Sequence, residues 1–169
     1  MLEILQYPDS RLRAKASPVE NVKDSKIQKI IDEMFETMYK SPNCAGLSAT
    51  QLNIKDPKRI SVINVSPDNE QSFCLINPVI IHHEEESKYI EGCMSIYPDH
   101  IRAEIKRPDK ITFKALDRDG KPIQMATQGF LARCVQHEID HLNGILFIDH
   151  LSLLKRKMIE KKIAKLSFN

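Results

Sequence analysis

The sequence has little of what marks a secreted or membrane-inserted protein. Its four cysteines, Cys44, Cys74, Cys93 and Cys134, are too few and too irregularly spaced for a disulfide framework. No apolar run approaches the roughly 20 residues of a membrane-spanning helix. The first residues also lack the charged and apolar regions of a signal peptide. We therefore expect a cytoplasmic protein with reduced thiols and no membrane partner.

Internal repeats, low-complexity tracts and linkers are also absent. A chain of 169 residues is long enough for one good core, so we expect a single domain over residues 1–169. Apolar residues make up 41% of the chain and charged residues 28%, as in an ordinary soluble globular protein. The net charge of only +2 gives no reason to expect DNA as a partner.

The charge is unevenly distributed along the chain. Residues 151–169 carry six cations against Glu160 alone, so this segment is +5 and the other 150 residues are −3. The cations are Lys155, Arg156, Lys157, Lys161, Lys162 and Lys165. The apolar residues at helical spacing are Leu151, Leu154, Met158, Ile159 and Ile163. This spacing predicts a basic amphipathic helix over about residues 151–166, with its apolar face docked on the body.

The most informative motif is the pentad His137-Glu138-Ile139-Asp140-His141. Two histidines four residues apart lie on one face of a helix, where a single metal ion can bind both. The His-Glu-x-x-His pattern is typical of metal-assisted hydrolysis, in which the glutamate is the general base for a metal-bound water. Surrounding apolar residues predict a buried helix, capped by Thr127 and stopped at Asn143-Gly144.

A catalytic metal site keeps three protein ligands and leaves a fourth position open. Cys93, after Gly92 and before a short polar turn, offers a thiolate that would complete a tetrahedral set with the two histidines. A small buried hydrophobe is the other interpretation of this cysteine. Downstream, His150 and Glu160 also remain possible third ligands, although their spacing favours neither.

The remaining pattern predicts the fold class. Apolar residues at helical spacing predict a first helix from about Asp24 to Tyr39, followed by a loop from Cys44 to Gln51. The turn Asp117–Gly120 is typical of a hairpin. The β-rich runs are residues 60–65, 73–81, 88–90, 101–105, 111–116 and 123–126. We therefore expect an α+β fold with mainly antiparallel sheets packed around the central metal-binding helix, and with an N-terminal and a C-terminal helix.

Three ordered motifs resemble those of the peptide deformylase family: Gly46–Gln51, Glu91–Ser95 and Gln136–Leu142. The opening Tyr7–Leu12 and the turn Asp117–Gly120 are similar to that family too, so the resemblance spans nearly the whole chain. It implies a metal-dependent hydrolase that removes the formyl group from the initiator formyl-methionine of nascent bacterial or organellar polypeptides. A bacterial cytoplasm is expected ahead of an organelle.

The resemblance also implies roles for individual residues. The metal would be Fe²⁺, with Zn²⁺, Ni²⁺ or Co²⁺ possible, and its ligands would be Cys93, His137 and His141. Glu138 would accept a proton from the attacking water and pass it to the departing amine. The Gln51 side chain and the Met94 backbone N–H would stabilise the oxyanion. Without the resemblance, Gln51 is better explained as a polar loop residue making a turn hydrogen bond.

Substrate contacts follow from the same resemblance. The backbone of Ala45 and Gly46 would pair with an extended peptide as a strand edge does, and Arg102 would contact the peptide. The residues of the methionine pocket would be Tyr89, Phe130 and Cys134. Spacing alone allows core packing equally well for Phe130 and Cys134.

The chain departs from the family pattern at several positions. Glycine is usual where Cys44 stands, alanine where Ser48 stands, and an apolar residue at the pocket rim where Arg133 stands. The other departures are Ala45, for a branched apolar residue, and Tyr97, an apparent insertion that shifts the loop before Arg102. Since none removes a ligand or Glu138, we expect them to affect substrate preference rather than catalysis.

Two other functions fit part of the pattern. A metallopeptidase that cleaves internal peptide bonds would share the pentad, but it leaves the Glu91–Ser95 motif unexplained. A structural metal site in a binding module would use four protein ligands, and only three present themselves. The basic C-terminal helix adds a possible partner, the ribosome, because cations attract ribosomal RNA.

Overall fold

The fold is built on one antiparallel sheet whose five strands lie in chain order, β1-β2-β3-β4-β5. The structure is a computed structural model that describes residues 1–66, 68 and 71–168. The strands are β1 (Gly46–Ser48), β2 (Ile60–Ile63), β3 (Phe73–Glu91), β4 (Ala103–Leu116) and β5 (Pro122–Gln128). The α-helices are α1 (Ser25–Lys40), α2 (Gly129–Leu142) and α3 (Leu153–Leu166). Three short 3-10 helices are η1 (Ser10–Arg13), η2 (Ala49–Gln51) and η3 (Phe147–His150). The predicted α+β class is confirmed.

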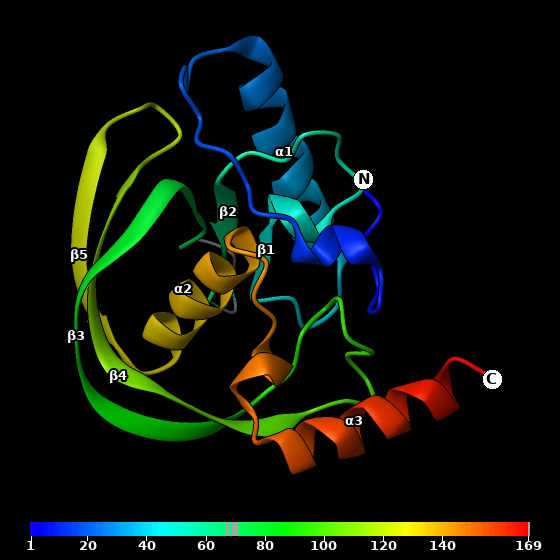
Figure 1. The fold of residues 1–169 in the computed structure, drawn as a ribbon. Coiled ribbons are helices and arrows are strands. Elements are labelled where there is room, and N and C mark those ends of the chain that lie inside the picture. Colours follow the sequence, from blue (N-terminus) through cyan, green and yellow to red (C-terminus); the bar gives the residue numbers. More distant parts are fainter. Residues whose placement is uncertain (67, 69–70, 169) are drawn as a thin grey trace.

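The long strands form a curved wall around the central helix α2 (Figure 1). β3 and β4 pair over most of their length, and two register shifts lie between Ile76 and Val79 and between Ile80 and His82. Such irregularities bend a strand and increase its twist. Helix α1 packs beside β1 and β2, whereas α3 lies at the opposite end of the molecule, next to η3. The wall therefore encloses α2, and α3 is left outside.

In two places, short strands that the sequence predicts separately form one continuous strand in the structure. Residues 73–81 and 88–90 both belong to β3, and residues 101–105 and 111–116 mostly belong to β4. The missed residues lie in the exposed middle of the wall, where Glu84 pairs with Lys110 and Glu86 with Pro108. Residues 82–86 of β3 are exposed on both faces, and the buried position in the missed part of β4 is the polar Arg107, so this stretch shows no apolar alternation and gives no strand signal. β1 and η2 likewise lie within the predicted loop Cys44–Gln51.

Helix α2 is buried because apolar side chains cover it from several strands. Ile63 from β2 and Phe113 from β4 join Val135 and Ile139 in one apolar cluster. Val135 is fully buried, and burying a side chain of this size contributes about 1.5–3 kcal/mol. This packing fixes the direction in which the polar side chains of α2 point.

The ends of α2 differ in how well they were predicted. Thr127 is not the cap: it lies in β5 paired with Ile111, and the N-cap is Gln128, whose side chain makes no capping hydrogen bond. The predicted stop at Asn143-Gly144 is confirmed, because Gly144 has φ +73°. A Cβ atom at Gly144 would also collide with the Arg13 carbonyl oxygen. Both the positive φ and this close contact therefore require glycine at this position.

The C-terminal helix forms as predicted, but it packs differently. It starts at Leu153 behind the N-cap Ser152, and it docks through Ile159, Ile163 and Leu166. The predicted docking residues Leu154 and Met158 are instead 71% and 64% exposed. Apolar residues occur on both sides of this helix, so spacing alone did not identify the docked side. Among the described residues, no helix combines the length and apolar character needed to cross a bilayer.

Candidate metal centre and active site

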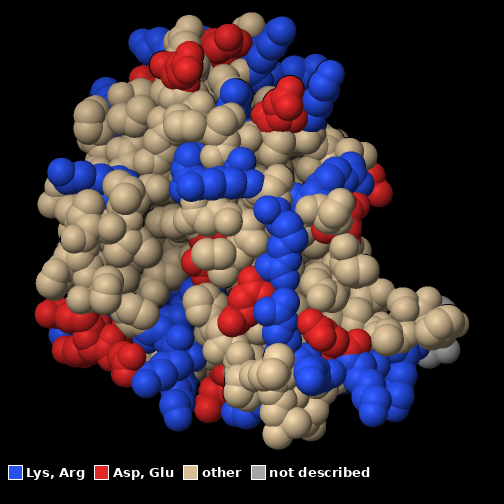
Figure 2. Space-filling view, viewed as in Figure 1, with Lys and Arg blue, Asp and Glu red and all other residues tan. Residues whose placement is uncertain are grey.

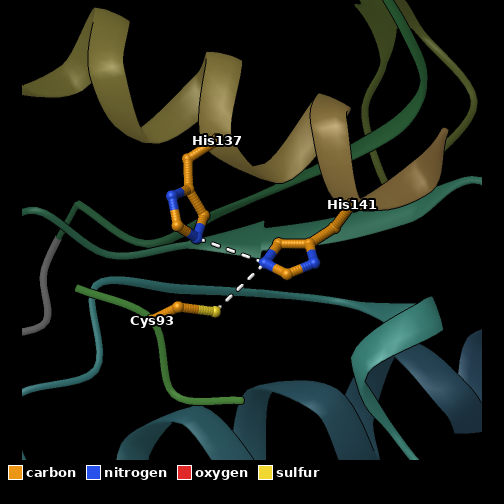
Figure 3. Close-up of side chains that lie close together, drawn as sticks. All are labelled: Cys93, His137 and His141. Atoms are coloured by element: carbon orange, nitrogen blue, oxygen red, sulfur yellow. Dashed lines mark hydrogen bonds between the residues drawn. The ribbon is translucent and has the colours of Figure 1, made fainter. Parts of the chain in front are cut away.

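Cys93, His137 and His141 converge at the inner end of the wall. Figure 3 shows both imidazoles reaching down from α2 toward Cys93, which follows the end of β3. The Cys93 Sγ lies 3.3 Å from His141 Nε2, which lies 3.2 Å from His137 Nε2. One donor atom from each residue falls within 4.8 Å of the other two, so this group could hold a metal ion. The fold therefore brings together the three residues that the sequence proposed as ligands.

The surroundings of this group suit a cation. Burial alone would lower the pKa of His137, but the neighbouring Cys93 and Glu91 side chains raise it well above its ordinary value. Burial and the adjacent His137 hold the pKa of His141 well below its ordinary value, so this ring stays neutral. The His137 Nδ1 faces Glu91 Oε1 at 3.1 Å, which turns Nε2 toward the group. One cysteine sulfur and two imidazole nitrogens are donors that fit a transition-metal ion.

Glu138 is buried beside this group and faces β1. Its Oε1 accepts a hydrogen bond of 2.9 Å from the Ser48 hydroxyl. A Cβ atom on Gly46 would lie 2.9 Å from its Oε2, so glycine allows β1 to approach the carboxylate closely. Burial raises the pKa of Glu138, against the lowering effects of His137 and the Ser48 hydrogen bond. The departure at Ser48 thus contacts the candidate base itself, and its effect on substrate preference stays a prediction.

Gln51 connects β1 to the turn that carries Cys93. Its Oε1 accepts from the Ser48 backbone N–H at 3.0 Å, the turn hydrogen bond that loop chemistry suggests. Its Nε2 points the other way, 3.1 Å from Ser95 Oγ and 3.6 Å from Cys93 Sγ. Met94 follows Cys93 directly and is half-buried. Both proposed oxyanion donors therefore belong to segments that contact the three-residue group.

A buried ion-pair network extends from His137 toward the surface. Arg107 donates to Glu91 Oε2 from Nε at 2.7 Å and to Asp140 Oδ2 from Nη1 at 2.9 Å. Burial would raise the pKa of Glu91, but the hydrogen bonds from His137 and Arg107 lower it to about 2. His150, one alternative ligand, lies 2.8 Å from Asp140 and outside the candidate metal group. The other alternative, Glu160, accepts a hydrogen bond from Arg156.

The sequence did not identify this network. Arg107 belongs to no motif. Glu91 was named only as the first residue of the Glu91–Ser95 motif, without a role of its own. Their contact depends on how β3 and β4 pair, which places Ser87 opposite Arg107 and Glu91 opposite Ala103. The sequence around Glu91 gave no signal for this contact, because Tyr89 and Ile90 are both exposed and show no alternation that would mark Glu91 as buried.

The predicted substrate-binding residues lie on two sides of the metal group. Tyr89 is 51% exposed and Phe130 is 62% exposed, whereas Cys134 is buried one helical turn after Phe130. Arg102 is exposed and lies beside Gly92. On the other side, β1 is the edge strand of the sheet, and the Ala45 carbonyl oxygen accepts from Asn64 N–H. Their contacts with a substrate stay a prediction.

Arg133, the departure that we expect at the rim of the pocket, is a buried residue of α2. The side chain is only 4% exposed, and its guanidinium donates to Glu91 Oε2 at 3.2 Å. This departure, like Ser48, therefore contacts a carboxylate of the central site rather than only the surface that a substrate would meet.

Comparisons with known proteins agree with this geometry. The family model described as polypeptide deformylase matches residues 1–157. A protein named peptide deformylase 1 from Coxiella burnetii is 50% identical over 166 residues, covering 98% of this chain and 96% of the relative. The crystal structure of a peptide deformylase from Legionella pneumophila matches with a TM-score of 0.89 at 42% identity, covering 98% of this chain and 94% of the other. A peptide deformylase from Ehrlichia chaffeensis, crystallised with actinonin, matches with a TM-score of 0.87 at 40% identity, covering 98% and 96% of the two chains. The resemblance found in the motifs is confirmed, and the chain belongs to the polypeptide deformylase family.

Proposed function

We propose that this protein removes the N-terminal formyl group from the formyl-methionine of nascent polypeptides in a bacterial cytoplasm. Membership of a family of enzymes that remove N-formyl groups supports the reaction, and the bacterial relatives support the compartment. The observation that carries the proposal is the convergence of Cys93, His137 and His141 beside the buried carboxylate of Glu138.

Cys93, His137 and His141 would hold one divalent ion, Fe²⁺ in the first place, with Zn²⁺, Ni²⁺ and Co²⁺ also suited to these donors. In the described part of the chain the group has three members, which is the ligand number of a catalytic rather than a closed structural site. When bound, the ion supplies a Lewis acid that polarises the formyl oxygen and makes water acidic enough to react near neutral pH.

Glu138 is the proton carrier in this scheme. Its carboxylate accepts the proton of the attacking water while the water oxygen bonds to the formyl carbon. It then delivers that proton to the nitrogen as the carbon–nitrogen bond breaks, which yields formate and a free amine. Such transfers contribute about 10²–10⁴-fold to the rate. Burial, which raises the pKa of Glu138, suits a group that must both take up and release a proton.

Gln51 and Met94 would stabilise the negative charge that develops on the formyl oxygen. The Gln51 side chain is buried, and its Oε1 is held by the Ser48 N–H, so its amide N–H₂ is fixed on the side of Cys93. The Met94 backbone N–H would be the second donor. A donor that is held in place before the reaction stabilises the transition state without reorganisation, and losing one costs about 2.7–4 kcal/mol.

The peptide would enter along the edge of β1. The backbone of Ala45 and Gly46 would pair with it as an added strand. Because Gly46 lies against Glu138, the first residue of the peptide would then lie beside this carboxylate. Tyr89, Phe130 and Cys134 would surround the methionine side chain, and Arg102 would contact the chain beyond it.

Formate release is the direct test. The protein loaded with Fe²⁺, Ni²⁺ or Zn²⁺ is incubated with a formyl-methionyl tripeptide, with its acetyl analogue, and with an unformylated peptide of the same length. We expect formate from the first substrate alone, at one metal ion per chain. Cleavage of internal bonds without formate would instead establish the metallopeptidase, and full metal occupancy without any hydrolysis would favour a structural site.

We further propose the ribosome as a partner of α3. Figure 2 shows Lys and Arg side chains along the lower right edge of the molecule, where α3 lies, with other side chains between them. The exposed residues of this surface are Leu153, Leu154, Lys155, Lys157, Met158, Lys161, Lys162 and Lys165. Six cations within 19 residues fit the phosphate backbone of RNA, and binding through them weakens as salt rises.

Co-sedimentation with ribosomes tests this partner. Replacing Lys155, Lys157, Lys161 and Lys162 with Gln should lower the affinity at low salt and flatten its salt dependence. Turnover of a short formyl peptide should not change, because the four lysine side chains are exposed, whereas Cys93 and His141 are buried. Unchanged co-sedimentation of this variant would show that α3 is only a charged, solvated helix.

A further inference from the structure

Arg133 is a buried cation that joins α2 to two strands. Its Nη2 donates to the backbone oxygens of Ser87 on β3 at 3.0 Å and Ile105 on β4 at 2.8 Å. Its Nη1 donates to Glu91 Oε2 at 3.2 Å. The guanidinium therefore fixes the inner end of the wall against the helix that carries His137 and His141.

Glu91 is the point at which Arg133 acts on the metal group. Its two oxygens contact His137 Nδ1, Arg107 and Arg133 together. His137 follows Arg133 by one helical turn, so α2 presents both the imidazole and the guanidinium to the same carboxylate. Arg107 holds Glu91 from β4, and Arg133 holds it from α2. The carboxylate is thereby clamped between two elements in the orientation that meets His137.

Tyr89 is the second side chain that Arg133 holds. The Arg133 Cζ lies 4.5 Å from the centroid of the Tyr89 ring, a cation–π contact. Tyr89 and Glu91 are two residues apart on β3 and so point to the same side of the strand. The ring is half exposed, and the guanidinium covers one of its faces. Without that contact an exposed tyrosine has several rotamers open to it.

We propose that Arg133 is a positioning residue that holds Glu91 against His137 and Tyr89 beside the approach to the metal group. The role of Tyr89 toward a substrate rests on the proposed function, whereas the role of Glu91 toward His137 does not. The planar guanidinium meets three acceptors and one ring at once, which neither an apolar residue nor lysine can do. Its Nε is buried without a hydrogen-bond partner among the described residues, a cost that a residue serving packing alone would avoid.

The experiment compares Arg133→Met, Arg133→Lys and a control, Arg118→Met. Arg118 also links two elements by hydrogen bonds, to Gln28 and Asp32, but it lies away from the metal group. Zinc-loaded proteins are mixed with a chelator and the release of metal is followed. Loss of a partner behind a ligand typically costs 10–100-fold in metal affinity. We expect about 10-fold faster release for Arg133→Met, a smaller increase for Arg133→Lys and none for Arg118→Met.

A spectroscopic signature separates positioning from general loosening. In the NMR spectrum of histidine-labelled protein, the Nδ1 proton of His137 should exchange slowly with water while it is hydrogen-bonded to Glu91. In Arg133→Met the signal of this proton should broaden. A folded Arg133→Met protein that keeps this proton and releases zinc at the wild-type rate would overturn the proposal. If Arg133→Met does not fold, Arg133→Lys decides by the same two measurements.

Kinetics test the contact with Tyr89. Tyr89→Leu should raise KM for a formyl-methionyl peptide severalfold, leave kcat nearly unchanged and leave zinc release unchanged. Arg133→Met should raise KM to a similar extent in addition to its effect on zinc. An unchanged KM in both variants would overturn this part. If the wild type hydrolyses no formyl peptide, the proposed function fails, and zinc release and the His137 proton still decide whether Arg133 positions Glu91.

Discussion

Helices α2 and α3 have the same length and opposite environments. Each spans 14 residues and contains seven apolar ones, yet nine residues of α2 are buried and only Ile163 is buried in α3. The number of apolar residues therefore does not decide burial here. The neighbours do: α2 runs between β1, β2 and the curved part of β4, whereas α3 follows η3 along the outside.

The difference extends to the polar residues of the two helices. Inside α2, Arg133 donates to Glu91, Gln136 donates to the Pro108 carbonyl oxygen, and Glu138 accepts from Ser48. Buried polar groups need such partners, and the partners fix their positions. The lysines of α3 are exposed, although Lys162 donates to the His100 carbonyl oxygen at 2.8 Å. One helix thus suits chemistry that needs fixed geometry, and the other suits association through charge.

The largest effect should come from the buried carboxylate of α2. Glu138→Gln keeps the size and one acceptor but removes the proton-accepting group, so kcat/KM should fall by about 10²–10⁴-fold. The metal content and the melting temperature should stay close to those of the wild type. A variant that retains more than about a tenth of the wild-type kcat/KM, a loss under ~1.4 kcal/mol, would show that Glu138 is not the general base.

Metal retention should depend next on Cys93. A serine hydroxyl is a poor substitute for a soft thiolate, so Cys93→Ser should lose most of its metal on dialysis, as measured by metal analysis. Iron-loaded wild type should also lose activity in air, because a thiolate beside ferrous ion is open to oxidation, whereas nickel- or zinc-loaded protein should survive. Full occupancy in Cys93→Ser would mean that Cys93 is not a ligand.

Stability offers the most direct test of the two environments. Leu142→Ala removes a fully buried side chain from α2, and Leu154→Ala removes one from α3 that is 71% exposed. In urea unfolding of the metal-free proteins, the first should cost about 2–5 kcal/mol and the second at most about 0.5 kcal/mol. Similar costs for both would mean that α3 packs on the body more closely than its exposure indicates.

Sequence patterns predicted the elements that pack on the core. Helix α1 and the buried parts of β2, β3 and β4 have apolar residues at the period of their structure, and their predicted ranges were close to the observed ones. The polar stretch of β3 around Glu84–Glu86 was missed because its pairing with β4 is all that keeps it extended. The docked face of α3 was missed because Leu154 and Met158 are as apolar as the residues that pack.

Sequence spacing predicted the part of the site that lies on a single helix, but not the contacts between separate elements. The pentad placed His137 and His141 on one helix face, and the structure brings Cys93, the third ligand proposed from the sequence, to them. The pairing of Arg107 with Glu91 is set by the β3–β4 register, which no short motif records. The positions of Ser48 and Arg133 were read from family departures, but only the fold shows that each meets a carboxylate.

The smallest effect that we predict concerns the pH dependence of Glu138. The carboxylate must be ionised to accept a proton, so activity should fall as the pH drops through its pKa. Burial raises that pKa above the ordinary value, whereas the hydrogen bond from Ser48 lowers it.

Ser48→Ala removes this hydrogen bond, so the acidic limb of kcat/KM should move to higher pH while the plateau changes little. A hydrogen bond worth about 1 kcal/mol corresponds to roughly fivefold lower activity on that limb. Ser61→Ala is the matched control, because the Ser61 hydroxyl contacts the Ser48 hydroxyl at 2.8 Å, whereas Ser48 is the residue that donates to Glu138; this variant should shift the limb less. A limb that stays in place or moves to lower pH in Ser48→Ala would show that the hydrogen bond from β1 does not lower the pKa of this carboxylate.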